Sequence, residues 1–403
     1  MRIDPAQHDW MTAPQTLAVF AALPQARFVG GAVRNALLGL AVTDIDIAVP
    51  MPPDLVIARL KDAGIKVIET GIDHGTVTAI VGRRIFEITS LRRDVATDGR
   101  HAQVQFTDDW ALDAARRDFT INAMYAALNG EVFDYASGRD DLAVGRVRFM
   151  GDAATRIAED YLRVLRLFRF HAWYGKGDLD ADGLRACACA KDKLKSLSAE
   201  RIAKEMLRLL EAPDPVPVLR VMAATGILSV LLPGTLNLAR LARLVQIDVR
   251  EHFAPDAVLR LAALLPDAAA AQAVADALKL SNVQRTRLEQ ALDGAVLDAG
   301  LPAQQARRLL YRIGAARLRD KVRLAWAGDD HGGGWRLLLD MAAHWQVPRF
   351  ALTGADVMQA GVAQGPQVGR ILAHIEDWWI GTDFTADEAA LRARLDEAVR
   401  HGV

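Results

Sequence analysis

The spacing of hydrophobic residues changes once along the chain, near residue 150. Before that point, alternating or continuous apolar runs predict strands at 44–50, 66–70, 76–81, 83–93 and 131–135. Helical spacing predicts helices between these strands, at 32–40, 54–64 and 111–128. Alternation of this kind predicts a domain with a mixed sheet and helices.

After Gly151 the strand pattern disappears. Segments 154–175, 199–211 and 216–232 have helical spacing, and helical segments separated by Gly and Pro continue to residue 403. We therefore predict the α+β class, with a mixed-sheet head followed by an all-helical neck and body. The expected regions are an extension at 1–26, the head at 27–150, the neck at 151–230 and the body and tail at 231–403.

Composition narrows the choice of protein class. The chain has 403 residues, of which 51% are hydrophobic and 25% charged, which excludes large-scale disorder. Its 49 basic and 50 acidic residues give no overall signal for a polyanionic partner. Cys187 and Cys189 are too close in sequence for an unstrained disulfide, and no apolar run approaches a membrane helix. We expect a cytoplasmic protein without membrane association.

Two pairs of residues between positions 30 and 46 carry candidate chemistry. Gly30 and Gly31 stand at an expected strand-to-helix turn, where the missing side chains let backbone approach a phosphate chain. Asp44 and Asp46 are two residues apart on the expected strand 44–50, so their carboxylates should share one face. Paired oxygen ligands of this kind suit Mg²⁺.

Each of these features alone is common in ordinary turns and strand ends. Together with Arg34 they fall within 17 residues, which favours a functional site. The glycine spacing matches neither a dinucleotide fingerprint nor a P-loop. Glu87, in the expected strand 83–93, is a candidate third carboxylate or an ordinary residue on a strand face.

Arginines recur at two further places. One is the sequence RRDFTIN at 116–122, and the other lies in the expected helix 154–175. There Arg163, Arg166 and Arg169 recur every third residue and fan over about 120° of one side. Since apolar residues are interleaved with them, we interpret this side as facing a polar ligand; the alternative is a surface helix with Arg/Asp pairs.

In this order, the motifs resemble the nucleotidyltransferase family that contains the CCA-adding enzymes of tRNA and the bacterial poly(A) polymerases. The matching motifs cover roughly the first half of the chain and lie at 30–46, 116–122, 135–151, 159–170 and 197–210. The resemblance implies a polymerase-β-like nucleotidyltransferase head, a neck that binds the nucleotide base and RNA, and a body that binds tRNA.

The resemblance also implies roles for single residues. Asp44 and Asp46 would hold catalytic Mg²⁺, and the residues implied for nucleotide binding are Gly30, Gly31, Arg34, Arg117, Asp118, Asp160, Arg163, Arg166 and Arg169. In the family's pattern the glycines and Arg34 contact the triphosphate, and Arg117 and Asp118 bind ribose and phosphates. Asp160 and Arg163 read the base edge, with Arg166 and Arg169 supporting them. Asn35 departs from the family, which usually has Asp after this arginine.

Segment 90–110 has charge and Gly but little apolar periodicity, so we expect a flexible loop. In the resembled family, such a loop accompanies addition of the final A. Two stretches of the neck are basic: 146–176 has seven basic and three acidic residues, and 191–208 has six and three. They favour an RNA partner, although solvated helix faces would show the same pattern.

The main hypothesis is a nucleotidyltransferase that adds C, C and A to the 3′ end of tRNA from CTP and ATP. A poly(A) polymerase is the alternative, because 81–85 is similar to a signature of that subfamily. A catalytically silent RNA-binding protein is the non-enzyme alternative, and the presence of both Asp44 and Asp46 disfavours it. No protein partner is indicated.

Overall fold

The structure is a computed structural model that describes residues 2–69, 75–98, 101–294, 297–329 and 332–401. It contains two compact units. The first is Met1–Gly234 with Asp276–Leu280, and the second is Thr235–Ala275 with Ser281–Val403. The four regions expected from the sequence stay a prediction.

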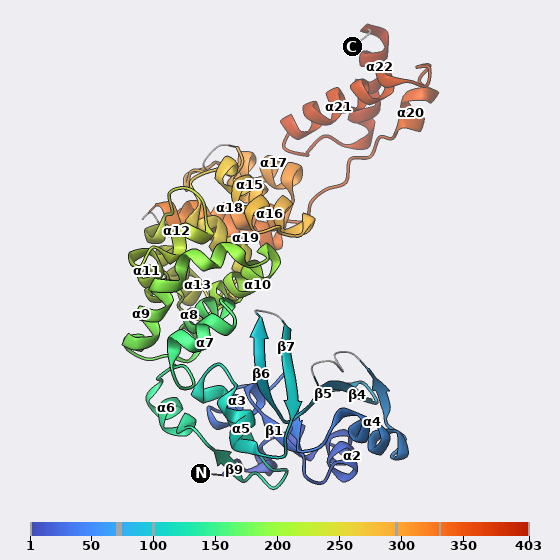
Figure 1. The fold of residues 1–403 in the computed structure, drawn as a ribbon. Helices are drawn as coiled ribbons and strands as arrows, with labels where there is room; N and C mark the ends of the chain where they lie inside the picture. Colours follow the sequence, from blue (N-terminus) through green and yellow to red (C-terminus); the bar gives the residue numbers. More distant parts are fainter. Residues whose placement is uncertain (1, 70–74, 99–100, 295–296, 330–331, 402–403) are drawn as a thin grey trace. The chain divides into compact units, whose positions relative to one another are not determined.

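The first unit contains a seven-stranded mixed sheet of order β3-β4-β5-β2-β1-β8-β9 (Figure 1). Its strands are β1 Arg27–Val29, β2 Asp46–Val49, β3 Lys66–Ile68, β4 Thr76–Val81, β5 Arg84–Ser90, β8 Met124–Ala126 and β9 Val132–Asp134. Only the β2–β5 pair among these is parallel. The predicted mixed-sheet head followed by helices is confirmed.

Buried and exposed residues alternate along the strands, so that one face of the sheet packs into the core. On β5, Phe86 and Ile88 are fully buried, while Ile85 and Glu87, which alternate with them, are exposed. Helix α4 Pro53–Asp62 packs against β3 and β4, and α3 Gly31–Leu37 packs against β1 and β8. These contacts anchor the turn before α3 and the start of β2 on one rigid frame.

The predicted helix at 111–128 is wrong. The chain forms α5 Trp110–Ala115, a 3₁₀ turn Thr120–Asn122 and then strand β8. All three residues of β8 are buried, and the strand pairs with β1 on one side and β9 on the other. A short continuous apolar run has no strand-specific period, so sheet pairing rather than local pattern decides its structure.

The predicted loop at 90–110 is also wrong. Strands β6 Arg92–Asp98 and β7 His101–Phe106 form an antiparallel pair with an irregularity between Asp94 and Ala96. Gly99 and Arg100, at the centre of the expected loop, lie outside the described residues. Backbone pairing across a hairpin needs no apolar side chains, which is why hydropathy missed these strands.

The neck is helical, as predicted, but its first long helix is divided. Segment 154–175 forms α7 Ala153–Glu159 and α8 Leu162–Tyr174. Between them Asp160 is extended, with φ −156°, and its Oδ1 accepts a hydrogen bond from the backbone N–H of Leu162 at 3.1 Å. A carboxylate that binds the free N–H groups of the following helix favours such a break. The other helices of the first unit are α1 Asp9–Thr12, α2 Pro14–Ala22, α6 Gly138–Val144, α9 Ala181–Ala190, α10 Ala199–Leu210, α11 Val216–Ala224 and α12 Ile227–Leu231.

Helices are the only regular elements among the described residues of the second unit. It contains α13 Leu238–Arg250, α14 Ala257–Leu264, most of α15 Ala268–Ala277, α16 Asn282–Leu292, α17 Ala303–Ile313, α18 Ala315–Gly328, α19 Gly332–His344, α20 Gly354–Gln359, α21 Pro366–Gly381 and α22 Glu388–His401. The last three helices share a core around Ile375 and Trp379. No helix in the described part of the chain is long and apolar enough to span a bilayer.

Candidate active site

The turn between β1 and α3 requires glycine at its first position. Gly30 has φ +65°, a left-handed conformation that other residues adopt with strain. Nη1 of Arg117 lies 3.7 Å from the point where a Cβ of residue 30 would stand. The turn therefore brings Gly30 and Arg117, which are far apart in sequence, to one place.

Arg34 leaves α3 and is only 6% exposed. Its Nη1 donates to Oδ1 of Asn122 at 2.5 Å, and its Nη2 donates to the hydroxyl of Tyr174 at 2.9 Å. Oδ1 of Asn35 accepts from Nη2 as well, at 3.0 Å, while Nδ2 of Asn35 donates to the carbonyl of Ala41. Burial lowers the pKa of Arg34 against the opposing effect of Tyr174. The guanidinium is thus held by neutral groups.

We expected both aspartates to lie on one strand, but only one of them does. Strand β2 begins at Asp46, which is half-buried, and the exposed Asp44 precedes it. Ile45 and Ile47 between and after them are buried as predicted. Glu87 stands opposite Asp46 in the parallel register of β2 and β5, so three carboxylates occupy one edge of the sheet.

These carboxylates have few partners among the described residues: Asp44 accepts a hydrogen bond from Oγ1 of Thr43 at 3.3 Å. Burial raises the pKa of Asp46, and Glu87 and Asp44 add to the effect against Arg117 and Arg34. Neither the carboxylate of Asp46 nor that of Glu87 accepts a hydrogen bond from any described residue. Oxygen donors with uncompensated negative charge fit a divalent cation. However, the described residues contain no group of three His, Cys, Asp or Glu side chains placed to hold a metal, so Glu87 is not gathered into one ligand set with the pair.

Arg117 is positioned by two residues that sequence reasoning missed. Its Nη2 lies 3.1 Å from Oδ2 of Asp113, and its Nε donates to the hydroxyl of Tyr125 at 3.2 Å. The same hydroxyl donates to Asp113 at 2.6 Å. Burial alone would raise the pKa of Asp113, but Arg117 and Arg116 outweigh it and hold that pKa below its usual value. The spacing of Asp113 four residues before Arg117 was the available sequence signal.

Asp118 faces the neck. Its Oδ2 accepts from Nε of Arg166 at 2.8 Å, and its Oδ1 accepts from Nδ2 of Asn122 at 3.0 Å. Burial opposes ionisation of Asp118, yet Arg166 and Asn122 keep its pKa below the usual range. The carboxylate thus connects the RRDFTIN motif to helix α8.

The other two arginines of α8 are also paired. Nε of Arg169 donates to Oε2 of Glu205 on α10 at 2.5 Å, and Glu205 is 5% exposed. Arg163 binds the carboxylate of Glu159 and donates to the carbonyl of Arg156 at 2.7 Å. The three arginines expected to face a ligand therefore each contact an acid of the protein.

Asp160 has a partner that the sequence did not suggest. Its Oδ2 accepts from Nη2 of Arg201 on α10 at 2.7 Å, across a pair that is about a quarter exposed on both sides. Both carboxylate oxygens are then engaged, since Oδ1 binds Leu162. Arg201 and Glu205 are one helical turn apart, so a single face of α10 holds Asp160 and Arg169.

A hollow of about 320 Å³ gathers part of this set. It is lined by Gly31, Arg34, Asn35, Val42, Thr43, Asp44, Asp46, Arg169, Trp173, Tyr174, Arg208 and Glu211. Arg117, Asp118, Asp160, Arg163 and Arg166 do not line it. Sequence reasoning missed Trp173, Tyr174, Arg208 and Glu211; Trp173 follows Arg169 by one turn of α8, which was the available signal.

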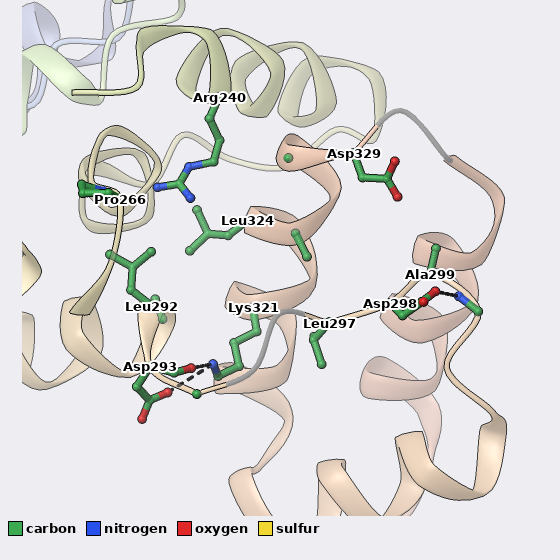
Figure 2. Close-up of a pocket in the computed structure, with 15 residues that line it drawn as sticks. Arg240, Pro266, Leu292, Asp293, Leu297, Asp298, Ala299, Lys321, Leu324 and Asp329 are labelled. Carbon is green, nitrogen blue, oxygen red and sulfur yellow. Dashed lines mark hydrogen bonds and ion pairs between the residues drawn. The ribbon is translucent and has the colours of Figure 1, made fainter. Parts of the chain in front are cut away.

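A larger hollow, of about 850 Å³, lies in the second unit (Figure 2). Its cations are already engaged: Nε of Arg240 donates to the carbonyl of Ala263 at 2.8 Å, and Nζ of Lys321 lies 3.1 Å from Oδ1 of Asp293. Size alone does not make it the active site, because it brings together no group comparable to the three carboxylates.

Comparison with known proteins shows the family of this chain. A family model described as "Poly A polymerase head domain" matches residues 26–148, and one described as "Probable RNA and SrmB- binding site of polymerase A" matches 178–238. A mouse protein, "CCA tRNA nucleotidyltransferase 1, mitochondrial", is 35% identical over 91% of this chain and 85% of its own length. The chain belongs to the CCA-adding enzyme family. Members of this family are nucleotidyltransferases, so the predicted enzyme class is confirmed.

Similarity to the CCA-adding enzymes extends over nearly the whole chain. The CCA-adding enzyme of Streptococcus sanguinis is 31% identical over 98% of this chain and all of its own length. The crystal structure of the Bacillus stearothermophilus CCA-adding enzyme in complex with CTP superposes with a TM-score of 0.76 at 27% identity, and the match covers 96% of this chain and 98% of that one. The resemblance seen in the first half of the sequence therefore continues through the helical body.

Proposed function

We propose that this protein adds C, C and A in turn to the 3′ end of tRNA, taking CTP and ATP as substrates and using no nucleic-acid template. The observation that carries the proposal is the hollow that Asp44 and Asp46 line together with Arg34 and Arg169, where burial and neighbouring acids raise the pKa of Asp46. Cationic and anionic groups side by side fit a nucleotide whose polyphosphate arrives with a metal ion. Relatives bearing the name CCA-adding enzyme support the choice of substrates.

In this proposal the turn at Gly30 and Gly31 receives the triphosphate. Arg34 and Arg117 lie at that turn and supply positive charge, and both are oriented before any nucleotide binds. Preorganised donors stabilise charge that develops on the phosphates at little further cost. Asp118 holds Arg166 directly. It also holds Asn122, which is a hydrogen-bond partner of Arg34.

The acceptor's 3′-hydroxyl oxygen forms a bond to the α-phosphorus, and the bond to the pyrophosphate breaks. Mg²⁺ held by Asp44 and Asp46 would supply Lewis-acid stabilisation of the phosphate oxygens. The chain's own contribution is to orient the polyphosphate with its arginines and to leave the carboxylate of Asp46 without a hydrogen-bond donor among the described residues. Glu87 would act as a third acid at the same edge of the sheet.

Selection of the base would fall to Asp160 and Arg163. A carboxylate and a guanidinium offer an acceptor and donors that can match the edge of cytosine or adenine. Both are held by protein groups, Arg201 and Glu159, so a base must share these partners or displace them. Arg166 and Arg169 would support this pocket from α8.

Binding of the folded tRNA would use the basic stretches 146–176 and 191–208, which can neutralise backbone phosphates. We further propose a cytoplasmic location, since Cys187 and Cys189 are both free thiols, as expected in a reducing compartment.

The test is incorporation into tRNA that lacks its 3′ CCA, with product length read on a gel. CTP alone should add two residues, and CTP with ATP should add three and then stop. Long tails made from ATP alone would show instead a poly(A) polymerase, the alternative that the sequence of residues 81–85 suggested. Absence of incorporation from any nucleotide, with RNA binding retained, would favour the silent RNA-binding protein.

A further inference from the structure

The last residue of helix α8 lies against an arginine of the head. Tyr174 is half-buried, lines the hollow of about 320 Å³, and its hydroxyl accepts a hydrogen bond from Nη2 of Arg34 at 2.9 Å. The guanidinium carbon of Arg34 lies 4.1 Å from the centroid of the tyrosine ring, a distance at which cation and ring attract each other. A side chain of the neck thus contacts the arginine that we assign to the triphosphate.

The hydroxyl of Tyr174 has a capacity that the described residues do not use. A phenol hydroxyl can accept hydrogen bonds and also donate one. Tyr174 accepts from Arg34, but its own O–H donates to no described residue. Tyr125 differs: its hydroxyl also accepts from an arginine, Arg117, but its proton is donated to Asp113 at 2.6 Å. The proton of Tyr174 is therefore available to an acceptor on a ligand in the hollow.

Arg34 is also left with one unused donor. A guanidinium has five N–H groups. Nε donates to Oδ1 of Asn35 at 3.2 Å, and Nη2 donates to the same oxygen at 3.0 Å as well as to Tyr174. One N–H of Nη1 donates to Asn122, and the other has no acceptor among the described residues. Arg34 and Tyr174 therefore each offer one N–H or O–H group at the same hollow, which is the requirement of a ligand with several oxygens.

The end of α8 is held in place by its neighbours. Trp173 donates from Nε1 to the carbonyl of Arg208 on α10 at 2.7 Å. Phe170, one turn before Tyr174, is 5% exposed, and its ring lies 5.9 Å from the tyrosine ring. The hydroxyl is therefore oriented before a ligand arrives, which reduces the conformational entropy lost on binding.

We propose that Tyr174 binds the polyphosphate of the incoming nucleotide, donating its O–H proton to a phosphate oxygen while it accepts from Arg34. The inference rests on the proposed function, which places the triphosphate at Gly30 and Gly31. Tyr174 contacts phosphate rather than base, because it follows Arg163 by eleven residues of one helix, a rise of about 16 Å. Its contribution is therefore the same for CTP and ATP.

The test is Tyr174→Phe, which keeps the ring beside Arg34 and removes only the hydroxyl. The KM for CTP and the KM for ATP should both rise about tenfold, the equivalent of one hydrogen bond to a charged acceptor. Discrimination between CTP and UTP should stay within about twofold, because no base contact is lost. The melting temperature should change by less than about 2 °C.

Tyr135→Phe is the matched control. It also removes a hydroxyl that accepts from an arginine, since Nη1 of Arg27 donates to Tyr135 at 3.0 Å, but Tyr135 does not line the hollow. Both KM values should stay within about twofold of wild type in this variant. A similar rise in both variants would mean that loss of any such hydroxyl disturbs the head, and the inference would be wrong.

Inorganic tripolyphosphate gives a readout that needs neither a base nor catalysis. Its dissociation constant, measured by calorimetry with Mg²⁺ present, should rise about tenfold in Tyr174→Phe. The same rise should appear when Tyr174→Phe is added to Arg34→Lys, which keeps a positive charge at position 34, because the hydroxyl contacts the phosphate itself. If the rise disappears in the Arg34→Lys background, Tyr174 acts only through Arg34 and the inference is wrong.

The inference and the proposed function can fail separately. If wild type incorporates CTP but Tyr174→Phe keeps its affinity for tripolyphosphate, or raises the KM for one nucleotide only, the inference is wrong and the proposed function stands. If wild type incorporates nothing, the proposed function fails. Weaker binding of tripolyphosphate by Tyr174→Phe would then still support a polyphosphate contact, and unchanged binding would refute that too.

Discussion

At position 35 a single amide performs two tasks that a carboxylate could not combine. Asn35 accepts from Arg34 through Oδ1 and donates to the carbonyl of Ala41 through Nδ2. Aspartate, the residue usual in the family, could accept but not donate. Among the described residues, Arg34 therefore donates only to neutral acceptors, Asn35, Asn122 and Tyr174, which would leave its positive charge for a phosphate.

The proposed role of Asp46 can be tested directly by substitution. Asp46→Asn should lower incorporation of CTP at least about 100-fold, because in the proposed mechanism a charged group at the reacting phosphate is lost while the shape is kept. Binding of tRNA, measured by filter retention, should stay within about twofold, since phosphate contacts elsewhere dominate it. Asp62→Asn, an exposed acid at the end of α4, serves as control. Near-normal incorporation by Asp46→Asn would contradict the assignment.

The ionised carboxylate of Asp113 contributes to the stability of the folded protein. Its pKa is depressed in the folded state, so it contributes stability above the ordinary carboxyl pKa of about 3.9 and loses that contribution as the pH falls further. Asp113→Asn should cost about 2 kcal/mol at pH 7. The gap between wild type and variant in urea unfolding should narrow below about pH 4. A gap of the same size at every pH would mean that packing, not charge, is responsible.

At the scale of elements, helix α10 holds residues of the neck to which we assign base selection. One face of it holds Asp160 through Arg201 and Arg169 through Glu205. The sequence predicted α10 and α8 as helices, and it predicted the arginine fan, but not these pairs. Spacing along one helix shows which residues share a face, whereas the partner across a helix pair depends on how the two helices pack.

The role of α10 can be measured as selectivity. Arg201→Ala should leave Asp160 without its fixed partner and reduce discrimination between CTP and UTP about fivefold, the equivalent of one hydrogen bond. Kinetics with each of the four nucleotides would show it. Arg185→Ala, which removes an exposed ion pair of α9, is the matched control. Equal slowing with all four nucleotides would assign Arg201 to the fold rather than to base selection.

The predicted elements failed in two places of the head for one physical reason. Strand β8 and the hairpin β6–β7 are defined by pairing with other strands, and neither has the alternation that marks a half-buried strand. The strands around Asp46 and Glu87 were predicted, because their buried and exposed positions alternate clearly. The strands that carry Asp46 and Glu87 could thus be predicted from the sequence, whereas the other strands of the head could be predicted only in part.

At the scale of the whole molecule, motifs in the first half predicted the head and the family, and periodicity predicted a helical remainder. The division into two units was not predictable in the same way. Residues 276–280 belong to the first unit although the chain on both sides belongs to the second. Contacts between residues this far apart in sequence leave no trace in local hydropathy.

The second unit has an ionic core that should control its own stability. Asp248 is 1% exposed and contacts Nε of Arg260 at 3.3 Å and the guanidinium of Arg323. Asp248→Ala should cost about 3 kcal/mol, because two buried cations lose their acid. Asp340→Ala, an exposed acid of α19, should cost less than about 0.5 kcal/mol.

Calorimetry would measure the Asp248 effect, and CTP binding to the first unit should not change. Similar losses for Asp248→Ala and Asp340→Ala would show that the buried ionic cluster contributes nothing special.

The return of residues 276–280 to the first unit has a consequence for synthesis on the ribosome. Glu200 meets Lys279 at 3.3 Å, and the neighbouring Leu278 and Leu280 are buried. The active-site unit is therefore incomplete when Gly234 leaves the exit tunnel and must wait for residues up to 280. At bacterial to eukaryotic elongation speeds this interval lasts about 2 to 9 s, during which a nascent chain presents an unfinished surface to chaperones.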